Sequence, residues 1–361
     1  MIRYNVSTEG RGQSLKRRER DVSRVHTKIR STSSSAQQRQ PDPALVDAAW
    51  KARLQGASPT VALGKFDALH RGHRKLVTTA ANLKPSSTPY LISFDGMADV
   101  LGWEPRLPLV APCDRPRVLA SWEKACAGVV PQERGIPFSQ VRHLSPEDFV
   151  ALLAEDLGAV GVVVGSNYRF GYKAAGTAET LKKLGGEYGM KVEVVNLVER
   201  VGGVDTKGAG HGGLADTVSS SAVREALAAG DMVGVKECMG RPYRLVGRAK
   251  NAGDARELGF KTEASRDKDV SNVSGEVCMT WRIDSAEFLN QYPAAGIYKV
   301  KIGFAADDAG CACVDEAMLY PGQAIFDARG AVTINVEGGR DELSAWTGPL
   351  VSERRCLVEF V

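Results

Sequence analysis

Two histidines beside a short apolar run carry the clearest chemical signal in this chain. His70 and His73 stand three residues apart, with Gly72 between them, in the stretch G-K-F-D-A-L-H-R-G-H-R at 64–74. Imidazole groups can donate hydrogen bonds to phosphate oxygens as charge develops on a phosphoryl group in transfer. Such a reaction depends mostly on positioning and electrostatic stabilisation. The spacing therefore predicts nucleotide chemistry.

Two other interpretations of the histidine pair stay open. A zinc site would need further ligands, and the sequence offers no nearby Glu or Cys to complete a set with His70 and His73. The pair could also be two surface histidines at the start of a helix.

A strand and a helix must position the two histidines. Residues 60–63 form an apolar run that predicts a strand, and the apolar spacing from Lys75 to Ala81 predicts a helix. Where a strand of an α/β sheet ends and a helix begins, free backbone N–H groups and the helix dipole favour phosphate. We therefore expect the histidines at the ligand-binding edge of a sheet.

Two further segments contain groups that suit a nucleotide. Residues 217–224, T-V-S-S-S-A-V-R, place hydroxyl groups at a predicted helix start with Arg224 one turn later. These groups can bind phosphate or simply cap the helix. Residues 165–171, G-S-N-Y-R-F-G, follow an apolar strand and suit a planar ring or phosphate, although they could form an ordinary strand-to-helix loop. The sequence has no P-loop and no G-x-S-x-G elbow.

The composition is that of a globular protein of about two domains, at 361 residues with 43% hydrophobic and 25% charged side chains. No apolar run approaches the ~18–20 residues of a membrane span, so we expect no membrane partner. The seven cysteines form no C-x-x-C pair and are odd in number, which favours reduced thiols in an intracellular compartment.

The net charge of +4 is concentrated at the N-terminus. The first 40 residues carry ten Lys or Arg against three Asp or Glu, which leaves 37 basic and 40 acidic side chains in the rest. The pI is therefore no argument for nucleic-acid binding. We expect residues 1–41 to be a disordered basic leader. Its Arg- and Ser-rich composition is typical of an organelle transit peptide, and a basic arm without a targeting role is the alternative.

Strands and helices alternate over residues 42–240, which predicts an α/β domain with a doubly wound parallel sheet. Short alternating segments over residues 241–361 predict a second, all-β domain, a small barrel. After the first strand, the expected strands of the first domain are 90–94, 160–164 and 191–195. The expected helices are 44–54, 115–126, 145–157, 178–188, 221–229 and 232–239. In the second domain the expected strands are 243–246, 277–283, 296–302, 331–336 and 356–361.

The pattern G-x-F-D-x-x-H-x-G-H after a strand, with S-S-x-x-x-R at a late helix, resembles the nucleotidyltransferase superfamily. Within it the chain is similar to FAD synthetases (FMN adenylyltransferases). The resemblance covers about 58–303. It implies a Rossmann-like nucleotidyltransferase domain followed by a small β-barrel domain resembling riboflavin kinase. Further blocks that carry it lie at 106–115, 143–149, 165–171, 224–231 and 240–243.

Two departures from the bacterial pattern refine the resemblance. The S-F-D-G-M at 93–97 and the N-Y-R-F-G-Y at 167–172 are similar to the plastid FAD synthetases of plants and green algae. This similarity implies a location in the chloroplast stroma and agrees with the leader; a cytoplasmic location is the alternative. At 259–264 the chain reads G-F-K-T-E-A in place of the riboflavin kinase motif G-F-P-T-A-N. Thr262 remains, but the proline and the asparagine are lost.

The resemblance implies the reaction ATP + FMN → FAD + pyrophosphate, with Mg²⁺ bridging the ATP phosphates and no riboflavin kinase activity. One alternative is a bifunctional riboflavin kinase/FAD synthetase. Another is a non-catalytic flavin or nucleotide binder, against which the intact histidines argue. The resemblance implies catalytic roles for His70, His73 and Arg224. We expect ATP binding by Gly64, Phe66, Asp67, Gly72, Ser220 and Ser221, and FMN binding by Asn167, Arg169 and Phe170, while the metal ligands are unknown.

Overall fold

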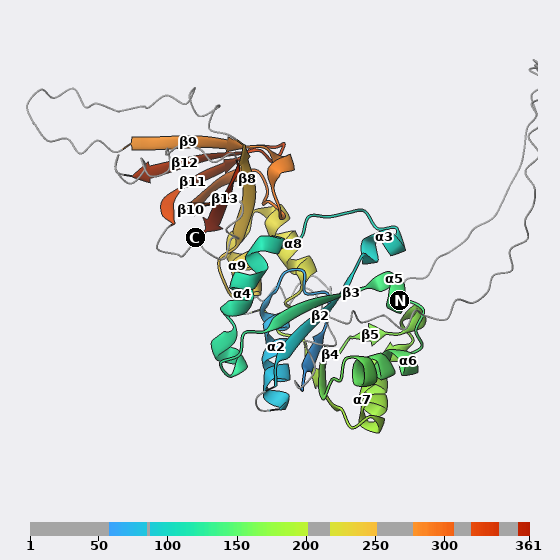
Figure 1. The fold of residues 1–361 in the computed structure, drawn as a ribbon. Coiled ribbons are helices and arrows are strands. Elements are labelled where there is room, and N and C mark those ends of the chain that lie inside the picture. The colour runs from blue at the N-terminus through green and yellow to red at the C-terminus, as the bar shows by residue number, and fades with distance from the viewer. Residues whose placement is uncertain (1–57, 85–86, 201–216, 251–276, 307–318, 339–352) are drawn as a thin grey trace, which may run out of the picture. The chain divides into compact units, whose positions relative to one another are not determined.

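The structure is a computed structural model that describes residues 58–84, 87–200, 217–250, 277–306, 319–338 and 353–361. The expected leader at 1–41, the expected helix at 44–54 and the altered motif at 259–264 lie outside the described residues. Two sheets dominate the described part, one parallel and one antiparallel (Figure 1).

Five parallel strands form the first sheet in the order β3-β2-β1-β4-β7. The central strand β1 is buried along its whole length, as expected for a strand covered on both faces. The chain order reverses between β1 and β4, so the carboxyl ends of these two strands border a topological switch point where α/β proteins bind ligands. The expectation of a doubly wound sheet is confirmed. The strands are β1 (Thr60–Leu63), β2 (Pro89–Asp95), β3 (Gln132–Pro137), β4 (Gly161–Gly165) and β7 (Lys191–Val195).

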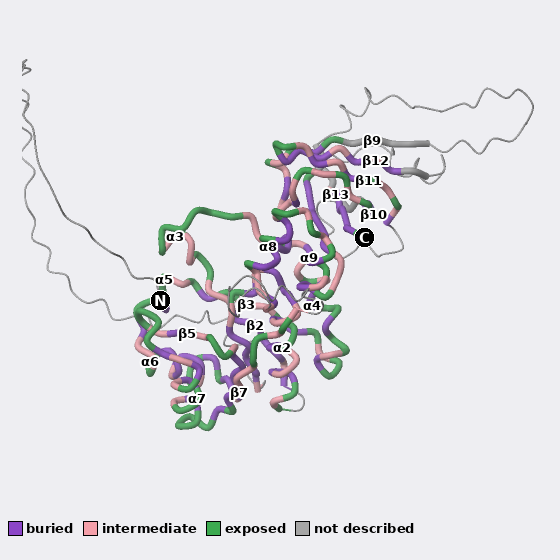
Figure 2. The backbone as a smooth tube through the Cα atoms, turned by 180° about the vertical axis from the view of Figure 1, so that it is seen from behind, coloured by how far each residue is buried: buried purple, intermediate pink, exposed green. Residues whose placement is uncertain are grey.

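Helices cover both faces of this sheet, and alternate residues of β1 enter two different hydrophobic cores. Ala62 packs in the core of α2 (Arg71–Leu83), α8 (Ser220–Ala229) and α9 (Met232–Met239). Val61 and Leu63 pack in the core of α6 (Pro146–Ala151) and α7 (Ala178–Glu187). This division follows from the two-residue period of a strand. In Figure 2 much of α7 is exposed, whereas the central strands β1, β2 and β4 are largely buried.

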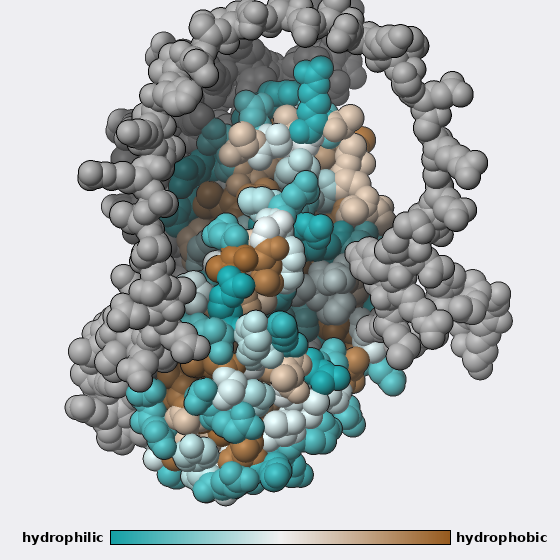
Figure 3. Space-filling view, turned by 90° about the vertical axis from the view of Figure 1, so that its right-hand side faces the viewer, coloured by the Kyte–Doolittle hydropathy of each residue, from teal (hydrophilic) through white to brown (hydrophobic). Residues whose placement is uncertain are grey.

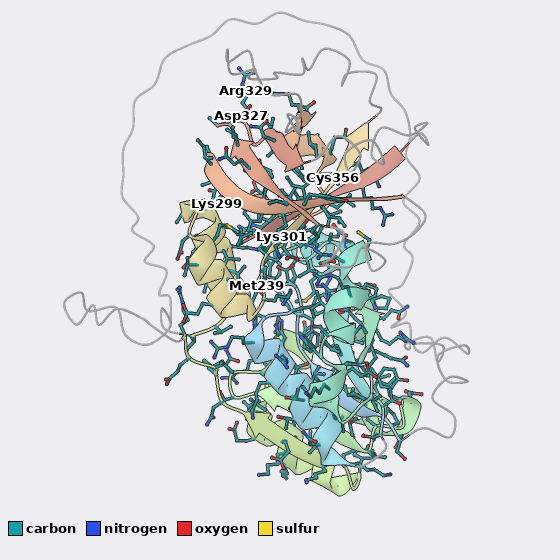
Figure 4. The ribbon with its side chains drawn as sticks, turned by 90° about the vertical axis from the view of Figure 1, so that its left-hand side faces the viewer. Met239, Lys299, Lys301, Asp327, Arg329 and Cys356 are labelled. Atoms are coloured by element: carbon teal, nitrogen blue, oxygen red, sulfur yellow. The ribbon has the colours of Figure 1, made fainter. Side chains whose placement is uncertain are left out.

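The second sheet is antiparallel, with six strands in the order β8-β13-β10-β11-β12-β9. Its two end strands also contact each other, so the sheet nearly closes and confirms the expected barrel-like domain. Along β10, Lys299 and Lys301 are exposed while Val300 and Ile302 are buried (Figure 4). The strands are β8 (Arg244–Lys250), β9 (Val277–Ile283), β10 (Gly296–Ala306), β11 (Tyr320–Phe326), β12 (Val332–Gly338) and β13 (Glu353–Phe360).

Two strands of the main sheets were not expected from the sequence. Strand β3 is polar and lies at the edge of the parallel sheet, with Ile136 as its buried residue. Strand β11 contains Pro321 and Gly322, which are typical of turns. Gly322 is required there because a Cβ atom at this position would lie 2.3 Å from the Asn335 carbonyl oxygen on the neighbouring strand.

Two expected helices differ in detail. The helix expected at 115–126 consists of α4 (Arg115–Ala120) and the 3₁₀ turn η2 (Glu123–Cys126). Ser121 lies at the break, where its hydroxyl donates to the Val118 carbonyl. The helix expected at 145–157 begins as α6 and continues as a π-helical turn, η3 (Leu152–Asp156). The remaining short elements are α3 (Met97–Leu101), α5 (Phe138–Val141), β5 (Arg169–Phe170), β6 (Gly176–Thr177), η1 (Pro112–Asp114), η4 (Tyr172–Ala174) and η6 (Ser285–Glu287).

A buried amide connects the start of the second sheet to the segment at 106–115. Asn290 is fully buried; its Nδ2 atom donates to the Arg244 carbonyl (2.9 Å) and the Leu109 carbonyl (3.4 Å), and its Oδ1 atom accepts from the Val246 N–H. The core around α2 and α8 also contains residues of β10, β11 and β12. These contacts join the two sheets through both polar and apolar groups.

The described residues contain four free cysteines, Cys113, Cys126, Cys238 and Cys356. No helix in the described part of the chain combines the length and the apolar character needed to cross a bilayer.

Candidate active site

The loop at residues 64–70, called here the histidine loop, joins β1 to α2. Phe66 and Leu69 have left-handed backbone conformations, with φ of 33° and 46°. Non-glycine residues in this region carry strain of order 1–3 kcal/mol each, which the surrounding structure must offset. The side chains of Phe66, Ala68 and Leu69 are fully buried, so their packing fixes this strained backbone.

Two arginines from distant parts of the sequence bind the backbone of this loop. Arg115 donates to the carbonyl oxygens of Phe66 (2.8 Å) and Asp67 (3.4 Å). Arg241 donates to the next two carbonyls, those of Ala68 (3.0 Å) and Leu69 (2.6 Å). Four consecutive carbonyls therefore accept hydrogen bonds from two guanidinium groups, an arrangement called here the arginine clamp.

The side chain of Asp67 provides a third support for the loop. Its Oδ1 atom accepts from the Leu109 N–H at 2.9 Å, and its Oδ2 atom accepts from Arg224 Nη2 at 2.8 Å. Arg224 also donates to the Leu107 carbonyl at 2.9 Å. The Asp67 carboxylate therefore orients the Arg224 side chain beside the histidine loop.

The loop ends at the histidine pair, whose rings are stacked with centroids 3.6 Å apart and an interplanar angle of 15°. His70 is the N-cap of α2, because its Nδ1 atom accepts from the His73 N–H at 3.2 Å. The Nδ1 atom of His73 is buried without a hydrogen-bond partner among the described residues. Gly72 lies against the ring of His70, where a Cβ atom would be 3.0 Å from Cε1.

Burial lowers the pKa of both histidines. The pKa of His70 falls to about 4, mainly through desolvation and then through the positive charge of Arg241. Desolvation also holds the pKa of His73 well below its ordinary value, helped by His70, Arg115 and Arg241. Both rings are therefore neutral at neutral pH in the free protein, and a bound polyanion would act in the opposite direction.

The histidine pair lines a cavity of about 920 Å³, a size typical of ligand sites. On the face that carries α3 and α5, Figure 3 shows groups of hydrophobic atoms between hydrophilic ones. The cavity lining includes a polar group and an aromatic group of residues. The polar lining comprises Gly64, Lys65, His70, Gly72, His73, Ser219 and Ser220, and the aromatic lining comprises Phe94, Phe138, Phe149, Tyr168, Phe170 and Tyr172.

Two helix N-termini meet the polar lining. Helix α2 begins after His70, and α8 begins after Ser219, whose Oγ atom accepts from the Ala222 N–H at 3.1 Å. Backbone N–H groups and helix dipoles at such positions favour anions. The cavity can therefore receive a phosphate chain at its polar lining and a planar ring at its aromatic lining.

The structure brings most of the predicted site residues together. Other predicted residues lie outside the cavity lining: Phe66 is buried in the core, and Asp67 and Arg224 pair with each other. Ser221 is exposed and is also outside the lining. Those that line the cavity are Gly64, His70, Gly72, His73, Asn167, Arg169, Phe170 and Ser220.

Sequence reasoning missed several lining residues and the arginine clamp. Lys65 lies inside the G-K-F-D motif, and its Nζ atom is 4.3 Å from the ring centroid of Trp103. Ser219 is part of the S-S-S run, where only the later two serines were selected. Arg115 is the last residue of the block at 106–115 and Arg241 lies in the block at 240–243, both of which carried the family resemblance. No pattern of neighbouring residues connects either arginine to the histidine loop.

Comparisons with known proteins address the identity of this site. The FAD synthetase family matches residues 54–204 of the chain. FAD synthetase 1, chloroplastic, of Arabidopsis thaliana is 40% identical over 280 residues, which cover 74% of this chain and 72% of that protein. The chain belongs to the FAD synthetase family. This assignment confirms the function expected from the sequence, FMN adenylyl transfer.

More distant relatives agree with the assignment. The bifunctional riboflavin kinase/FMN adenylyltransferase of Pseudomonas fluorescens is 30% identical over 208 residues, 55% of this chain and 60% of that protein. A crystal structure titled as a macrolide-efflux protein from Streptococcus pneumoniae matches with a TM-score of 0.57, 19% identity and 84% coverage of both chains. At that identity the likeness concerns the fold alone. The histidine loop at 64–70 lies inside the range that the FAD synthetase family matches.

Proposed function

We propose that this FAD synthetase joins the AMP part of ATP to FMN in the cavity described above. An oxygen of the FMN phosphate attacks the α-phosphorus of ATP in line and forms the new P–O bond. The bond from the α-phosphorus to its bridging oxygen breaks, and pyrophosphate leaves with the electron pair. The FMN phosphate is already anionic near neutral pH, so the attack needs no strong general base.

The stacked histidine pair is the observation that carries the proposal. Because His70 Nδ1 accepts a backbone hydrogen bond, the proton of the neutral ring lies on Nε2, where it can be donated. His73 lines the same cavity and supplies a second imidazole. The negative charge of the triphosphate raises the pKa of both rings, so they stabilise charge as it develops on the transferring phosphoryl group.

The polar lining binds ATP in this proposal. Gly64 and Gly72 let the nucleotide approach the backbone, and Ser220 offers its hydroxyl and the N-terminus of α8. Phe66 and Asp67 act indirectly through the shape of the histidine loop. Contact between Arg224 and the triphosphate stays a prediction, and it requires Arg224 to exchange the Asp67 carboxylate for a phosphate.

The aromatic lining binds the isoalloxazine ring. Phe170 lines the cavity and packs against Phe149, with ring centroids 5.3 Å apart. Asn167 and Arg169, which flank Tyr168 in the sequence, also line the cavity and can meet the FMN phosphate or the ring edge. Aromatic rings pair well in offset or tilted arrangements, which suits a flat tricyclic ring.

Mg²⁺ enters this proposal as a complex with ATP. Among the described residues there is no group of three or more His, Cys, Asp or Glu side chains that could hold a metal ion. Mg²⁺ usually keeps several waters and binds substrate phosphates, where it neutralises charge on the phosphate chain. We therefore assign no ligand of this chain to the metal.

Three further proposals rest on the sequence. The altered motif at 259–264 supports the absence of riboflavin kinase activity, because it lacks the proline and the asparagine of the kinase pattern. The basic leader and the chloroplastic name of the Arabidopsis relative support a plastid location. We also retain the division into a leader at 1–41, a transferase domain at 42–240 and a β domain at 241–361.

A single assay separates this function from its alternatives. The purified chain is incubated with ATP and MgCl₂ and with either FMN or riboflavin, and products are separated by chromatography. We expect FAD and pyrophosphate from FMN and no product from riboflavin. FMN formed from riboflavin would contradict the loss of kinase activity. Binding of FMN without pyrophosphate release would favour a non-catalytic flavin binder.

A further inference from the structure

Arg241 stands outside the cavity and outside the residues matched by the family, yet it reaches the backbone that presents the histidines. Its Nη1 and Nη2 atoms donate to the Leu69 and Ala68 carbonyls, directly before His70. Nη1 also meets the Met239 carbonyl at 3.3 Å. Met239 ends α9, beside the antiparallel sheet (Figure 4).

The turn before Arg241 directs this side chain toward α2. Gly240 is the C-cap of α9 and has a φ of 69°, a conformation that favours glycine. A Cβ atom at Gly240 would lie 2.9 Å from Cγ of Arg71, the first residue of α2. The chain therefore passes closely over the start of the histidine-bearing helix just before it enters the second sheet.

The two arginines of the clamp differ in their charge partners. Arg115 forms an ion pair with Glu133, which offsets its charge. The hydrogen bonds of Arg241 go to carbonyl oxygens, and desolvation lowers its pKa to about 9, with the nearby carboxylate of Asp114 acting in the opposite direction. Burying a guanidinium group that donates to neutral acceptors is costly, and Asp114 offsets only part of that cost.

We propose that Arg241 is a positioning residue for adenylyl transfer: its planar guanidinium fixes the Ala68 and Leu69 carbonyls and so sets the placement of the histidine pair. This inference rests on the proposed function. It also assigns a role to the beginning of the second domain, which supplies one half of the arginine clamp. Lysine cannot reproduce the two-pronged contact, because its ammonium is a point charge.

Arg241 also affects the charge of the histidines. The groups that face His70 are Arg241 and Asp67, and those that face His73 are His70, Arg115 and Arg241. Removing the positive charge at position 241 raises the pKa of both rings. The test therefore has a readout that does not depend on turnover.

The experiment compares Arg241→Lys and Arg241→Gln with Arg282→Gln, an exposed arginine of β9 that pairs with Asp327. We expect kcat to fall about 10- to 100-fold in both Arg241 variants, because a misplacement of about 1 Å can cost 10²-fold. The KM for FMN should stay within about twofold, and Arg282→Gln should match the wild type. In the His73→Ala background, Arg241→Lys should lower kcat by less than about twofold further.

Proton NMR titration of His70 gives the second readout, with the resonance assigned by loss in His70→Asn. We expect the midpoint of Arg241→Gln to lie above that of the wild type and the midpoint of Arg241→Lys to stay close to it. Wild-type kcat in both variants, or loss of fold in both, would overturn the positioning role. A wild-type protein that makes no FAD would instead overturn the proposed function, while the titration would still report the Arg241–His70 interaction.

Discussion

The polar and the aromatic linings of the cavity are held in different ways. The polar lining depends on the histidine loop, whose carbonyls and carboxylate bind three arginines, Arg115, Arg224 and Arg241. The aromatic lining comes mostly from short elements, namely α5, α6, β5 and η4, which carry Phe138, Phe149, Phe170 and Tyr172. Under the proposed function, this difference separates the residues that act on the phosphates from those that contact the flavin. Substitutions in the first group should change kcat, and those in the second should change KM.

The largest effect is expected from His73→Ala. Loss of one imidazole removes a donor to the transferring phosphoryl group, so kcat should fall about 10²- to 10³-fold. The KM for FMN should change little, because His73 belongs to the polar lining. Steady-state FAD formation measures both constants. His143→Ala is the control, since His143 is exposed, and near-wild-type kcat in His73→Ala would sink the assignment.

The low pKa of His70 predicts a pH dependence of stability. The ring binds a proton at pH 6.5 in the unfolded chain but only near pH 4 in the folded protein. Stability from this group is therefore present above about pH 6.5 and declines as pH falls toward 4, by roughly 3 kcal/mol in total.

Urea unfolding between pH 7 and pH 4.5 checks this dependence against His70→Asn, which keeps an N-cap acceptor without titrating. The variant should lose less stability than the wild type as pH falls. If the free energy of unfolding falls equally with pH in the wild type and in His70→Asn, His70 is not the group that causes the pH dependence.

Asp67→Asn tests the support of the polar lining. The substitution removes the charge that pairs with Arg224 at 2.8 Å but leaves an oxygen for the Leu109 N–H. We expect kcat to fall about tenfold through a looser histidine loop, with Asp99→Asn on α3 as an exposed control. If Arg224 instead acts on the triphosphate, freeing it should lower the KM for ATP and leave kcat unchanged.

Phe170→Leu tests the aromatic lining and should have the smallest effect. The smaller side chain loses ring contact with flavin, so the KM for FMN should rise about fivefold while kcat stays within about twofold. Stability should fall by roughly 1–2 kcal/mol. The control variant Phe326→Leu in the second sheet should lose stability while its kcat and its KM for FMN stay unchanged. A drop in kcat without a change in KM would show that the two linings are not separable.

Local patterns predicted the elements that local forces determine. Apolar periodicity and N-cap hydrogen bonds involve residues only a few positions apart. The sequence therefore revealed the strand at 60–63, the paired histidines and the serine run at the start of α8. Strand β3 was missed because its polar residues lie at a sheet edge.

The roles of Asp67, Arg224 and Arg241 depend on the three-dimensional fold. Asp67 lies 157 residues from its partner Arg224, and no periodicity links the two. Phe66 was expected at the nucleotide, but in the structure it anchors the loop from the core, and its ATP contact remains a prediction.

The contact between Arg241 and Leu69 spans 172 residues of chain. During synthesis the histidine loop leaves the ribosome long before Arg241 exists, so the arginine clamp cannot be complete until the first residues of the second domain have been added. Such distant contacts form slowly because a long segment of chain must be ordered first. The support of the histidine loop is therefore completed only once residue 241 has been added, and a nascent chain that ends before it carries both histidines without Arg241.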